Sequence, residues 1–414
     1  MYKFTLLDNN SLHDMAKLQI NAYPAALQNT SIEQFAEGLA ETNGRPDVQY
    51  YCTRKDDDTL VGGFSIWDFE MNMRQSMIKA GGIGGVAVDL CHKKEKVCRE
   101  IMRYFIKTLR EKGANIALLY PFDSSFYNRM GFGFGTLLQQ LRVKPDALIS
   151  GTSKAHIKRL SVDDAEMMTD FYNTHVKSTH GLIAKRPEEF AKSLKSPANK
   201  IFAYVDNGIR GYVFFQFRKS NADSWLINDM FIGELMFDSP DVFMELMAFV
   251  KSQGDQVRYV IVNTQDEGFI NTISDPRNHT EQILFSAYQE VAKTGLGIMY
   301  RICDVEAFFA DISGCGFGDL NMTLQVNVND SFVDDNNRPF LLKFSDGLCR
   351  LAADIIPDAE LCIDIAELSS IVMGSVNLKS LVKYGKVKLS DVSYLDVLSR
   401  AFALDEKPVC LTYF

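Results

Sequence analysis

Residues 84–102 read GGVAVDLCHKKEKVCREIM, a stretch that predicts a strand, a short basic turn and a helix in direct succession. The segment 86–88 (VAV) has strand character, and the segment 92–96 (HKKEK) forms the turn. A helix that begins after such a turn offers free N–H groups and a positive dipole end to a phosphate group. Because a phosphate cradle usually has a glycine in the turn and this turn has none, a solvated basic turn is the alternative reading.

The segments around this stretch complete a βαβ unit. Strands are predicted over 59–73 and 75–90, and the second of these contains Gly81, Gly82, Gly84 and Gly85. Glycines inside a strand indicate a bulge or the close approach of another backbone, and we expect this bare backbone to pair with a ligand. Apolar residues at four-residue steps from Val97 to Leu109 predict a helix that ends at Gly113. A short buried strand follows over 116–120.

The remainder of the chain divides into further parts. The segment 143–152 (VKPDALISGT) has the composition of a linker. The α/β segment that follows repeats the element order of the first part, without a glycine-rich strand followed by a basic turn. After about residue 299 the pattern predicts an alternating strand, a hairpin at Asp346-Gly347 and three short helices over 367–373, 378–384 and 394–402. These features predict three domains of mixed α/β structure.

Composition narrows the class of function. The 414 residues carry a net charge of -9, which argues against a general nucleic-acid binder and suits a cationic small molecule. The eight cysteines include no CxxC pair and the six histidines are scattered, so we expect reduced thiols and no metal site. The N-terminus lacks the apolar core of a signal peptide, and no apolar run has membrane-spanning length. The sequence therefore predicts a soluble cytoplasmic protein.

A few residues are candidates for chemistry. Tyr127, within SSFYNRMGFG, could act as an acid, because the unperturbed pKa of tyrosine lies near 10. Cys91 and Cys98 flank the basic turn without an evident histidine partner, so we interpret them as packing residues. His92 is interpreted as a helix cap, with phosphate contact as the alternative.

An ordered set of motifs resembles the N-terminal domain of the Eis family of GNAT-superfamily N-acetyltransferases. The set comprises V86-A-V88, H92-K-K, R99-E-I-M102, Y120 and F126-Y-N-R-M-G-F-G133. The resemblance extends over the whole chain and includes S369-S-I-V-M-G374 and the aromatic end at Phe414. It implies an α+β (mixed α/β) fold with tandem GNAT-like domains followed by a sterol-carrier-protein-like α+β domain. The implied boundaries are 1–147 for the first GNAT domain, 148–288 for the second, degenerate one and 289–414 for the last domain.

The resemblance also implies a site and a mechanism. Acetyl-CoA would lie along strand 86–88, with its pyrophosphate on the turn and with a backbone N–H of Val86 or a neighbour polarising the thioester. The Phe414 carboxylate would act as general base and Tyr127 as general acid. An α-carboxyl group has a free pKa of about 3.3–3.7, so burial or a relaying water would have to assist it. No metal is implied, and the implied acetyl-CoA-binding residues are Val86, Ala87, Val88, Lys93, Lys94, Glu95, Lys96, Val97, Cys98, Arg99 and Phe122.

The sequence departs from the family pattern at Lys96, which stands where the family has glycine. A Cβ there would crowd the pyrophosphate, so we expect weaker acetyl-CoA binding. The resulting hypothesis is an acetyl-CoA-dependent N-acetyltransferase that acts on amines of cationic small molecules such as aminoglycosides and forms homo-oligomers, with hexamers common in the family. One alternative is a protein-lysine or polyamine acetyltransferase. Another is a catalytically weakened acyl-CoA-binding, lipid-binding or assembly protein.

Overall fold

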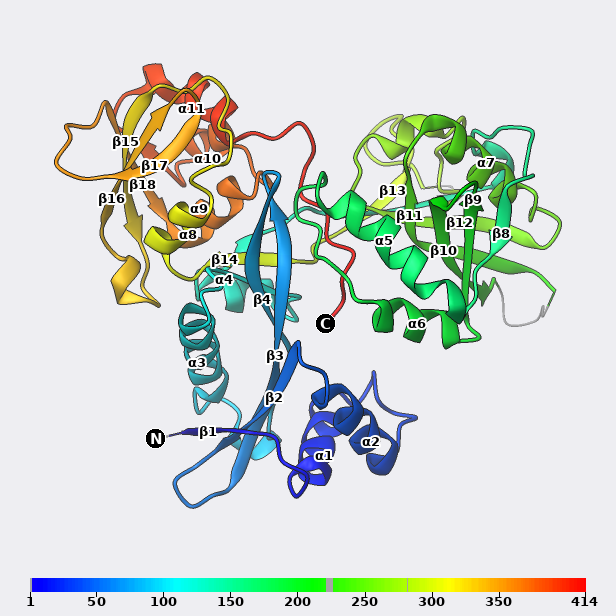
Figure 1. Ribbon diagram of the computed structural model, residues 1–414, viewed down its shortest axis with the longest axis horizontal. Helices are drawn as coiled ribbons and strands as arrows, with labels where there is room; N and C mark the ends of the chain where they lie inside the picture. Colours follow the sequence, from blue (N-terminus) through cyan, green and yellow to red (C-terminus); the bar gives the residue numbers. More distant parts are fainter. Residues whose placement is uncertain (1, 221–225, 281) are drawn as a thin grey trace. The chain divides into compact units, whose positions relative to one another are not determined.

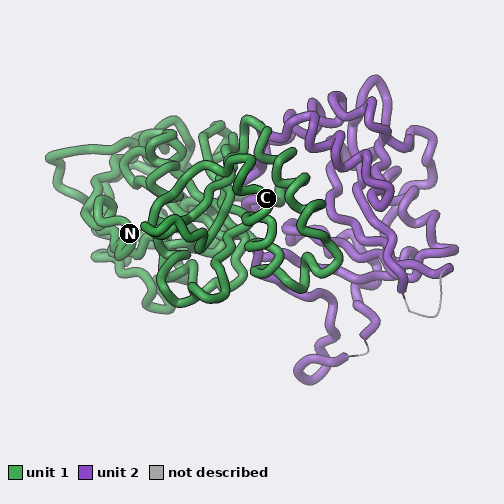
Figure 2. Tube along the Cα trace, turned by 90° about the horizontal axis from the view of Figure 1, so that it is seen from below, with its two compact units in different colours: residues 1–135, 298–405, 412–414 green, residues 136–297, 406–411 purple. Residues whose placement is uncertain are grey.

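The computed structural model describes residues 2–220, 226–280 and 282–414, which divide into two compact units (Figure 2). Unit 1 comprises residues 1–135, 298–405 and 412–414, and unit 2 comprises residues 136–297 and 406–411. The described residues form two seven-stranded sheets and one five-stranded sheet with helices packed on them, which confirms the predicted mixed α/β fold (Figure 1).

Unit 1 contains the sheet that carries the opening stretch of sequence. Its strand order is β1-β2-β3-β4-β5-β14-β6, and β4 and β5 form its parallel pair. The strands are β1 (Lys3–Leu6), β2 (Val48–Arg54), β3 (Leu60–Met73), β4 (Ser76–Val88), β5 (Ile116–Leu119), β6 (Gly133–Phe134) and β14 (Met299–Ile302). The helices of this part are α1 (Leu12–Ala22), α2 (Ile32–Asn43), α3 (Val97–Glu111) and α4 (Ser124–Asn128).

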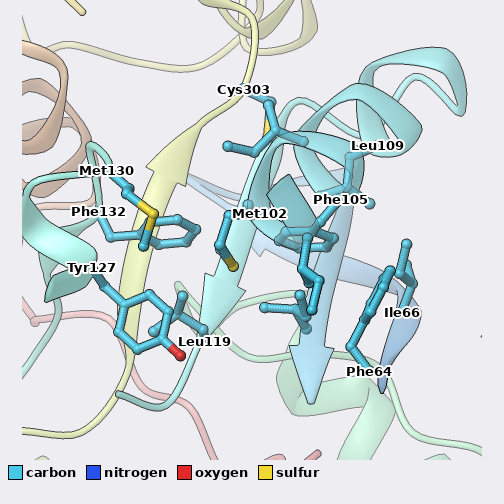
Figure 3. Packing of buried hydrophobic residues seen from close by; sticks show 14 of the residues in the cluster. Phe64, Ile66, Met102, Phe105, Leu109, Leu119, Tyr127, Met130, Phe132 and Cys303 are labelled. Carbon is cyan, nitrogen blue, oxygen red and sulfur yellow. The ribbon is translucent and has the colours of Figure 1, made fainter. Parts of the chain in front are cut away.

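The predicted strands and helix around the basic turn are confirmed. Strands β3 and β4 are the two long strands, and α3 packs against the sheet through the predicted apolar stripe (Figure 3). Within that stripe Ile101, Phe105 and Leu109 are fully buried. Helix α3 ends before Gly113, whose φ of 71° is the left-handed conformation that glycine adopts without strain.

Strand β4 separates from its parallel neighbour part-way along its length. The register pairs β4 with β5 only from Ala80 to Gly82, after which the two strands diverge. On the β3 side, Gly85 and Val86 together stand opposite Phe64 alone, which is a β-bulge. Gly85 adopts a φ of 55° at this bulge. The edge of β4 that faced β5 is therefore open from residue 83 to residue 88 in the described part of the chain.

The other sheet of unit 1 belongs to the C-terminal part of the chain. Its strand order is β17-β16-β15-β18-β19. The strands are β15 (Met322–Asn329), β16 (Pro339–Ser345), β17 (Leu348–Ala352), β18 (Ala359–Asp364) and β19 (Lys388–Leu389). The helices are α8 (Val305–Asp311), α9 (Ile365–Val372), α10 (Leu378–Lys383) and α11 (Leu395–Phe402), so the predicted hairpin and the three predicted short helices are confirmed.

Arg74, at the turn between β3 and β4, joins the two parts of unit 1. Its guanidinium donates hydrogen bonds to the carbonyls of Gly316 (3.0 Å) and Phe402 (2.8 Å). It also lies over the ring of Phe317, with 4.3 Å between the guanidinium carbon and the ring centroid. Burial lowers the pKa of Arg74 to about 10, which still leaves the side chain charged at neutral pH. The tip of the long hairpin is therefore fastened to the C-terminal part of the chain.

Unit 2 has a sheet of the same layout. Its strand order is β13-β7-β12-β11-β10-β9-β8, with β11 and β12 as the parallel pair. These two strands are paired only from Asn228 to Ile232, so β11 also continues beyond its parallel partner, as far as Phe237. The strands are β7 (Leu138–Val143), β8 (Ile157–Arg159), β9 (Asn199–Val205), β10 (Ile209–Lys219), β11 (Asn228–Phe237), β12 (Val257–Thr264) and β13 (Ala292–Gly295). The helices are α5 (Ala165–Val176), α6 (Pro187–Lys195) and α7 (Pro240–Lys251).

The strands of each sheet do not come from one continuous stretch of the chain, as the linear domain prediction assumed. Strand β7 belongs to the sheet of unit 2, whereas β14, which follows unit 2 in sequence, pairs with β5 and β6 in unit 1. The segment 143–152 is not the expected linker, because Val143, Ala147 and Leu148 are buried in the core of unit 2. The three-domain boundaries at 147/148 and 288/289 stay predictions.

The last residues of the chain belong to both units. Val409 and Leu411 pack on a core cluster of unit 2, and the backbone N–H of Val409 donates to the carbonyl of His180. Residues 412–414 belong to unit 1. None of the helices within residues 2–220, 226–280 and 282–414 combines the length and apolar character that crossing a membrane requires.

Candidate active site

Phe414 lies on the face of β4 where two glycines leave room for it. A Cβ atom built on Gly84 would come within 2.9 Å of the backbone C atom of Phe414 and within 3.1 Å of the Ser65 hydroxyl. A Cβ on Gly82 would come within 2.5 Å of the Phe414 ring. Any larger residue at these two positions would displace Phe414, so the glycines allow the end of the chain to lie against the strand.

Aromatic side chains of unit 1 surround this end of the chain. The Phe414 ring centroid lies 5.0 Å from that of Phe69 and 5.5 Å from that of Tyr120. Tyr120 also stacks on Tyr413 at 5.5 Å, and its hydroxyl donates to the carbonyl of Thr412 at 3.0 Å. These contacts hold residues 412–414 through their backbone and their rings together. Tyr120 was identified from the sequence only as part of a motif, and its contacts with the end of the chain were not predicted.

The space over the face of three strand glycines is filled by other parts of the same protein, whereas the pairing of their backbone with a ligand along the strand edge stays a prediction. Gly82 and Gly84 receive Phe414, and a Cβ on Gly81 would come within 2.2 Å of the Leu109 side chain of α3. These glycines accommodate other parts of the same protein. Gly85 is the exception, because it provides the left-handed backbone conformation of the bulge.

Tyr127 and Cys98 lie at the open part of β4. Tyr127 is buried in the same apolar cluster as Val86, Val88 and Cys98, next to Leu119 in Figure 3. Burial, with the Cys98 thiol as a smaller cause, raises the pKa of Tyr127 well above its usual value. Burial also raises the pKa of Cys98 to about 12. Both groups therefore hold their protons at neutral pH, and Cys98 has none of the thiolate character that a nucleophile requires.

Two residues next to β4 were not identified from the sequence. The side-chain amide of Gln19, in α1, donates to the carbonyl of Gly85 at 3.0 Å. The hydroxyl of Tyr23, just after α1, donates to the carbonyl of Val86 at 2.6 Å. A capping box or a motif has a recognisable spacing, but these contacts join residues more than 60 positions apart, so no local signal marks them.

The basic turn has the backbone shape of a glycine-containing turn. Lys94 (φ 68°) and Lys96 (φ 66°) both adopt the left-handed conformation, and Lys96 directly precedes α3. A left-handed residue next to a helix N-terminus is an arrangement in which backbone N–H groups form an anion-binding concavity. The conformation that the family glycine would favour is thus retained with lysine in its place.

Glu95 does not leave an uncompensated negative charge in this turn. Its carboxylate pairs with the Lys55 ammonium at 3.0 Å and lies 3.2 Å from Nδ1 of His92. Lys55, and to a smaller extent His92, lower the pKa of Glu95. His92 therefore contacts Glu95 and Lys55. The interpretation of His92 as a helix cap is wrong for α3, because Lys96 occupies the N-cap position. Cys91 is exposed, so its interpretation as a packing residue is wrong.

The other predicted acetyl-CoA-binding residues differ in their surroundings. Val97 is buried in the core beneath the turn, and Ala87 is buried in the cluster formed with α1. The exposed Arg99 has its guanidinium carbon 5.9 Å from the centroid of the Phe332 ring. Phe122 is 74 % exposed, and its ring centroid lies 5.6 Å from that of Tyr127. Lys93 is exposed at the turn.

Replacing Lys96 by glycine tests the effect of the departure from the family pattern. A left-handed conformation costs an L-residue about 1–2 kcal/mol, and glycine avoids this cost. The greater freedom of glycine in the unfolded chain offsets about 0.5–1 kcal/mol of the resulting stabilisation. We expect Lys96→Gly to stabilise unit 1 by about 1 kcal/mol and to tighten acetyl-CoA binding, measured by thermal unfolding and titration calorimetry. Lys93→Gly is the control for the unfolding measurement only, because Lys93 has a φ of -63° but belongs to the turn proposed to hold the pyrophosphate. Equal affinities for wild type and Lys96→Gly would contradict the crowding argument.

Comparisons with known proteins agree with this geometry. An acetyltransferase (GNAT) domain model matches residues 3–135, and a sterol carrier protein domain model matches residues 305–411. An uncharacterized N-acetyltransferase of Streptomyces coelicolor is 20% identical over 371 residues, which cover 85% of each chain. The chain is a GNAT-type N-acetyltransferase. Its GNAT domain and its sterol-carrier-like domain are the two domain types that the resemblance to the Eis family implied, and both are confirmed.

Solved structures support the fold of this acetyltransferase over its full length. A GCN5-related N-acetyltransferase from Anabaena variabilis superposes with a TM-score of 0.82 at 14% identity and full coverage of both chains. Eis1 from Mycobacterium abscessus superposes with a TM-score of 0.76 at 17% identity, again with full coverage of both chains. GNAT domains use acetyl-CoA as cosubstrate. The open edge of β4 and the basic turn are the two features of this chain suited to such a ligand.

Proposed function

We propose that this acetyltransferase transfers the acetyl group of acetyl-CoA to an amine of a cationic small molecule. Aminoglycosides are the example that the resemblance to the Eis family suggests. The observation that carries the proposal is the position of Phe414 on β4, beside Gly84 and Ser65. A carboxylate at this place would lie against β4, the strand whose open edge suits the acetyl donor. The net charge of -9 favours a cationic acceptor without selecting one.

The proposed reaction begins with the acceptor amine. The Phe414 carboxylate takes a proton from the ammonium group, and the nitrogen lone pair then attacks the thioester carbonyl carbon. The carbonyl oxygen gains negative charge, for which a backbone N–H of the β4 bulge is the proposed donor. The carbon–sulfur bond breaks, and the sulfur of CoA leaves with the bonding electron pair.

Tyr127 is the proposed donor to the departing sulfur. Because its pKa is raised, Tyr127 is a weaker acid than a thiol, whose ordinary pKa is about 8.5. Its hydroxyl therefore stabilises the thiolate chiefly as a hydrogen-bond donor. The nitrogen becomes positively charged on attack and releases a second proton as the amide forms, and the thiolate takes up that proton to give CoA thiol. The raised pKa also means that Tyr127 remains a donor throughout the neutral and mildly basic pH range.

The proposed binding mode of acetyl-CoA follows the described geometry. Pantetheine pairs with the open edge of β4 at 86–88, and the pyrophosphate occupies the turn 93–96 and the first residues of α3. The retained left-handed backbone of Lys96 favours this reading over the alternative that lysine disables the site. Assembly as a homo-oligomer and cytoplasmic location stay predictions.

Release of CoA thiol with a panel of amines tests the function. We expect thiol release that depends on acetyl-CoA and on a polycationic amine, with kanamycin as the aminoglycoside, spermidine as the polyamine and a lysine-containing peptide as the protein mimic. Mass spectrometry identifies the acetylated amine. Acetylation of the peptide alone would favour the protein-lysine alternative, and no release with any amine would contradict the proposal.

A further inference from the structure

The bulge in β4 leaves two successive residues without a partner in the sheet. Gly85 and Val86 have no registered partner on β3, because both stand opposite Phe64. On the other side, the pairing between β4 and β5 ends at Gly82. Backbone carbonyls in this position require other donors, or they would be free to rotate and to lose their hydrogen bonds.

Two side chains from the region of α1 supply those donors. Gln19 donates to the carbonyl of Gly85 at 3.0 Å, and Tyr23 donates to the carbonyl of Val86 at 2.6 Å. Gln19 is only 4 % exposed, and a Cβ on Gly85 would come within 3.0 Å of its amide nitrogen. The amide is therefore fitted closely to the bulge.

Holding a carbonyl also orients the N–H group of the same peptide. The peptide unit is planar and trans, so the carbonyl of Gly85 and the N–H of Val86 point in opposite directions. With the carbonyl bound to Gln19, the N–H of Val86 points away from that amide. The N–H of Val86 is the group proposed above to polarise the thioester carbonyl.

We propose that Gln19 is a positioning residue that aims the N–H of Val86 at the thioester carbonyl of acetyl-CoA, with Tyr23 fixing the next peptide of the bulge. This inference rests on the proposed acetyl transfer and on the proposed binding mode along β4. It assigns to α1 a role in the reaction although neither side chain touches the reacting atoms. A donor that is held in place before the reaction stabilises the developing charge without reorganisation, which is why its support affects the rate.

Replacement of Gln19 by leucine tests the proposal through kinetics and through a spectroscopic signal. We expect Gln19→Leu to lower kcat by about 10- to 100-fold, with the dissociation constant of acetyl-CoA changed by less than about threefold. Infrared difference spectra of bound acetyl-CoA, with and without ¹³C in the acetyl carbonyl, report the polarisation of that carbonyl directly. We expect the shift to lower frequency seen with wild type to be reduced in Gln19→Leu.

Tyr23→Phe is the second variant, and it remains informative if Gln19→Leu folds poorly. It removes one hydroxyl from the same bulge, and we expect a smaller loss of kcat and of the carbonyl shift. Tyr51→Phe is the matched control, since the Tyr51 hydroxyl donates to Gln49 at 2.9 Å and its removal takes no hydrogen bond from the β4 bulge. We expect this control to leave both readouts unchanged.

The outcomes separate the inference from the proposed function. An unchanged kcat in both variants, or a carbonyl shift that persists in both, would overturn the positioning role. The positioning role is also overturned if wild type does not bind acetyl-CoA, or if it binds acetyl-CoA without a shift of the carbonyl frequency. If wild type binds acetyl-CoA with a shift that Gln19→Leu loses, yet acetylates none of the amines, the positioning role stands and the proposed acceptor chemistry fails.

Discussion

Deletion of Phe414 is expected to lower kcat by about 10²- to 10⁴-fold, the range of a lost general base, while acetyl-CoA binding stays within about threefold of wild type. The deletion ends the chain one residue earlier, which moves the terminal carboxylate by about 3.5 Å along the backbone. The aromatic contacts of Phe414 with Phe69 and Tyr120 are lost at the same time. Steady-state kinetics and titration calorimetry measure the two quantities separately.

Two further variants distinguish the carboxylate from the ring. Phe414→Ala keeps a terminal carboxylate and removes the ring, so we expect a loss of kcat smaller than that of the deletion. An extension of several residues after Phe414 keeps the ring and removes the carboxylate, and we expect it to be as inactive as the deletion. Full activity of the extended protein would exclude the Phe414 carboxylate as the base.

Gly131→Ala is expected to destabilise unit 1 by about 3–5 kcal/mol, the range for breaking a buried ion pair. A Cβ on Gly131 would lie 1.5 Å from a guanidinium nitrogen of Arg301, a fully buried side chain that pairs with Asp330 at 2.6 Å. The same guanidinium donates to the carbonyl of Met130 at 2.7 Å. The added methyl group must therefore displace the arginine and leave the buried Asp330 carboxylate without its charged partner. Chemical denaturation followed by tryptophan fluorescence measures the loss.

Gly113→Ala is the matched control for this prediction. Gly113 has a φ of 71°, close to the 84° of Gly131, but a Cβ there would meet nothing within 4 Å. We expect Gly113→Ala to cost only the strain of the left-handed conformation, about 1–2 kcal/mol. Similar losses for the two variants would mean that backbone strain, and not the contact with Arg301, explains the effect at Gly131.

Much of the local structure could be predicted because it depends on neighbouring residues. The apolar spacing from Val97 to Leu109 defines one face of a helix, and the Asp346-Gly347 pair defines a turn; both elements are present in the structure. The aromatic end of the chain and the ordered motifs pointed to Phe414 and Tyr127. Phe414 lies against the glycines of β4, and Tyr127 belongs to the apolar cluster against which Val86 and Val88 of β4 pack.

Predictions that depended on the surroundings of a residue were less successful. The glycines of β4 indicated the close approach of another backbone, but no local pattern identified that backbone as Phe414, which is more than 300 positions later in the sequence. Cys91 was expected to pack and is exposed. Gln19 and Tyr23 carry no motif and gain their role only through the bulge that they contact.

The sequence by itself predicted the strand, turn and helix at 84–102, indicated the GNAT-type class and identified Phe414 and Tyr127, the two residues proposed to act in the reaction. Periodicity and turn chemistry act over a few residues, so they can be read along the chain. Only the tertiary structure decided that β7 and β14 join different sheets, that the lysine turn keeps the backbone of a glycine turn, and that Phe414 lies on the glycines of β4. These arrangements arise from the burial and fit of distant segments, which no local pattern encodes.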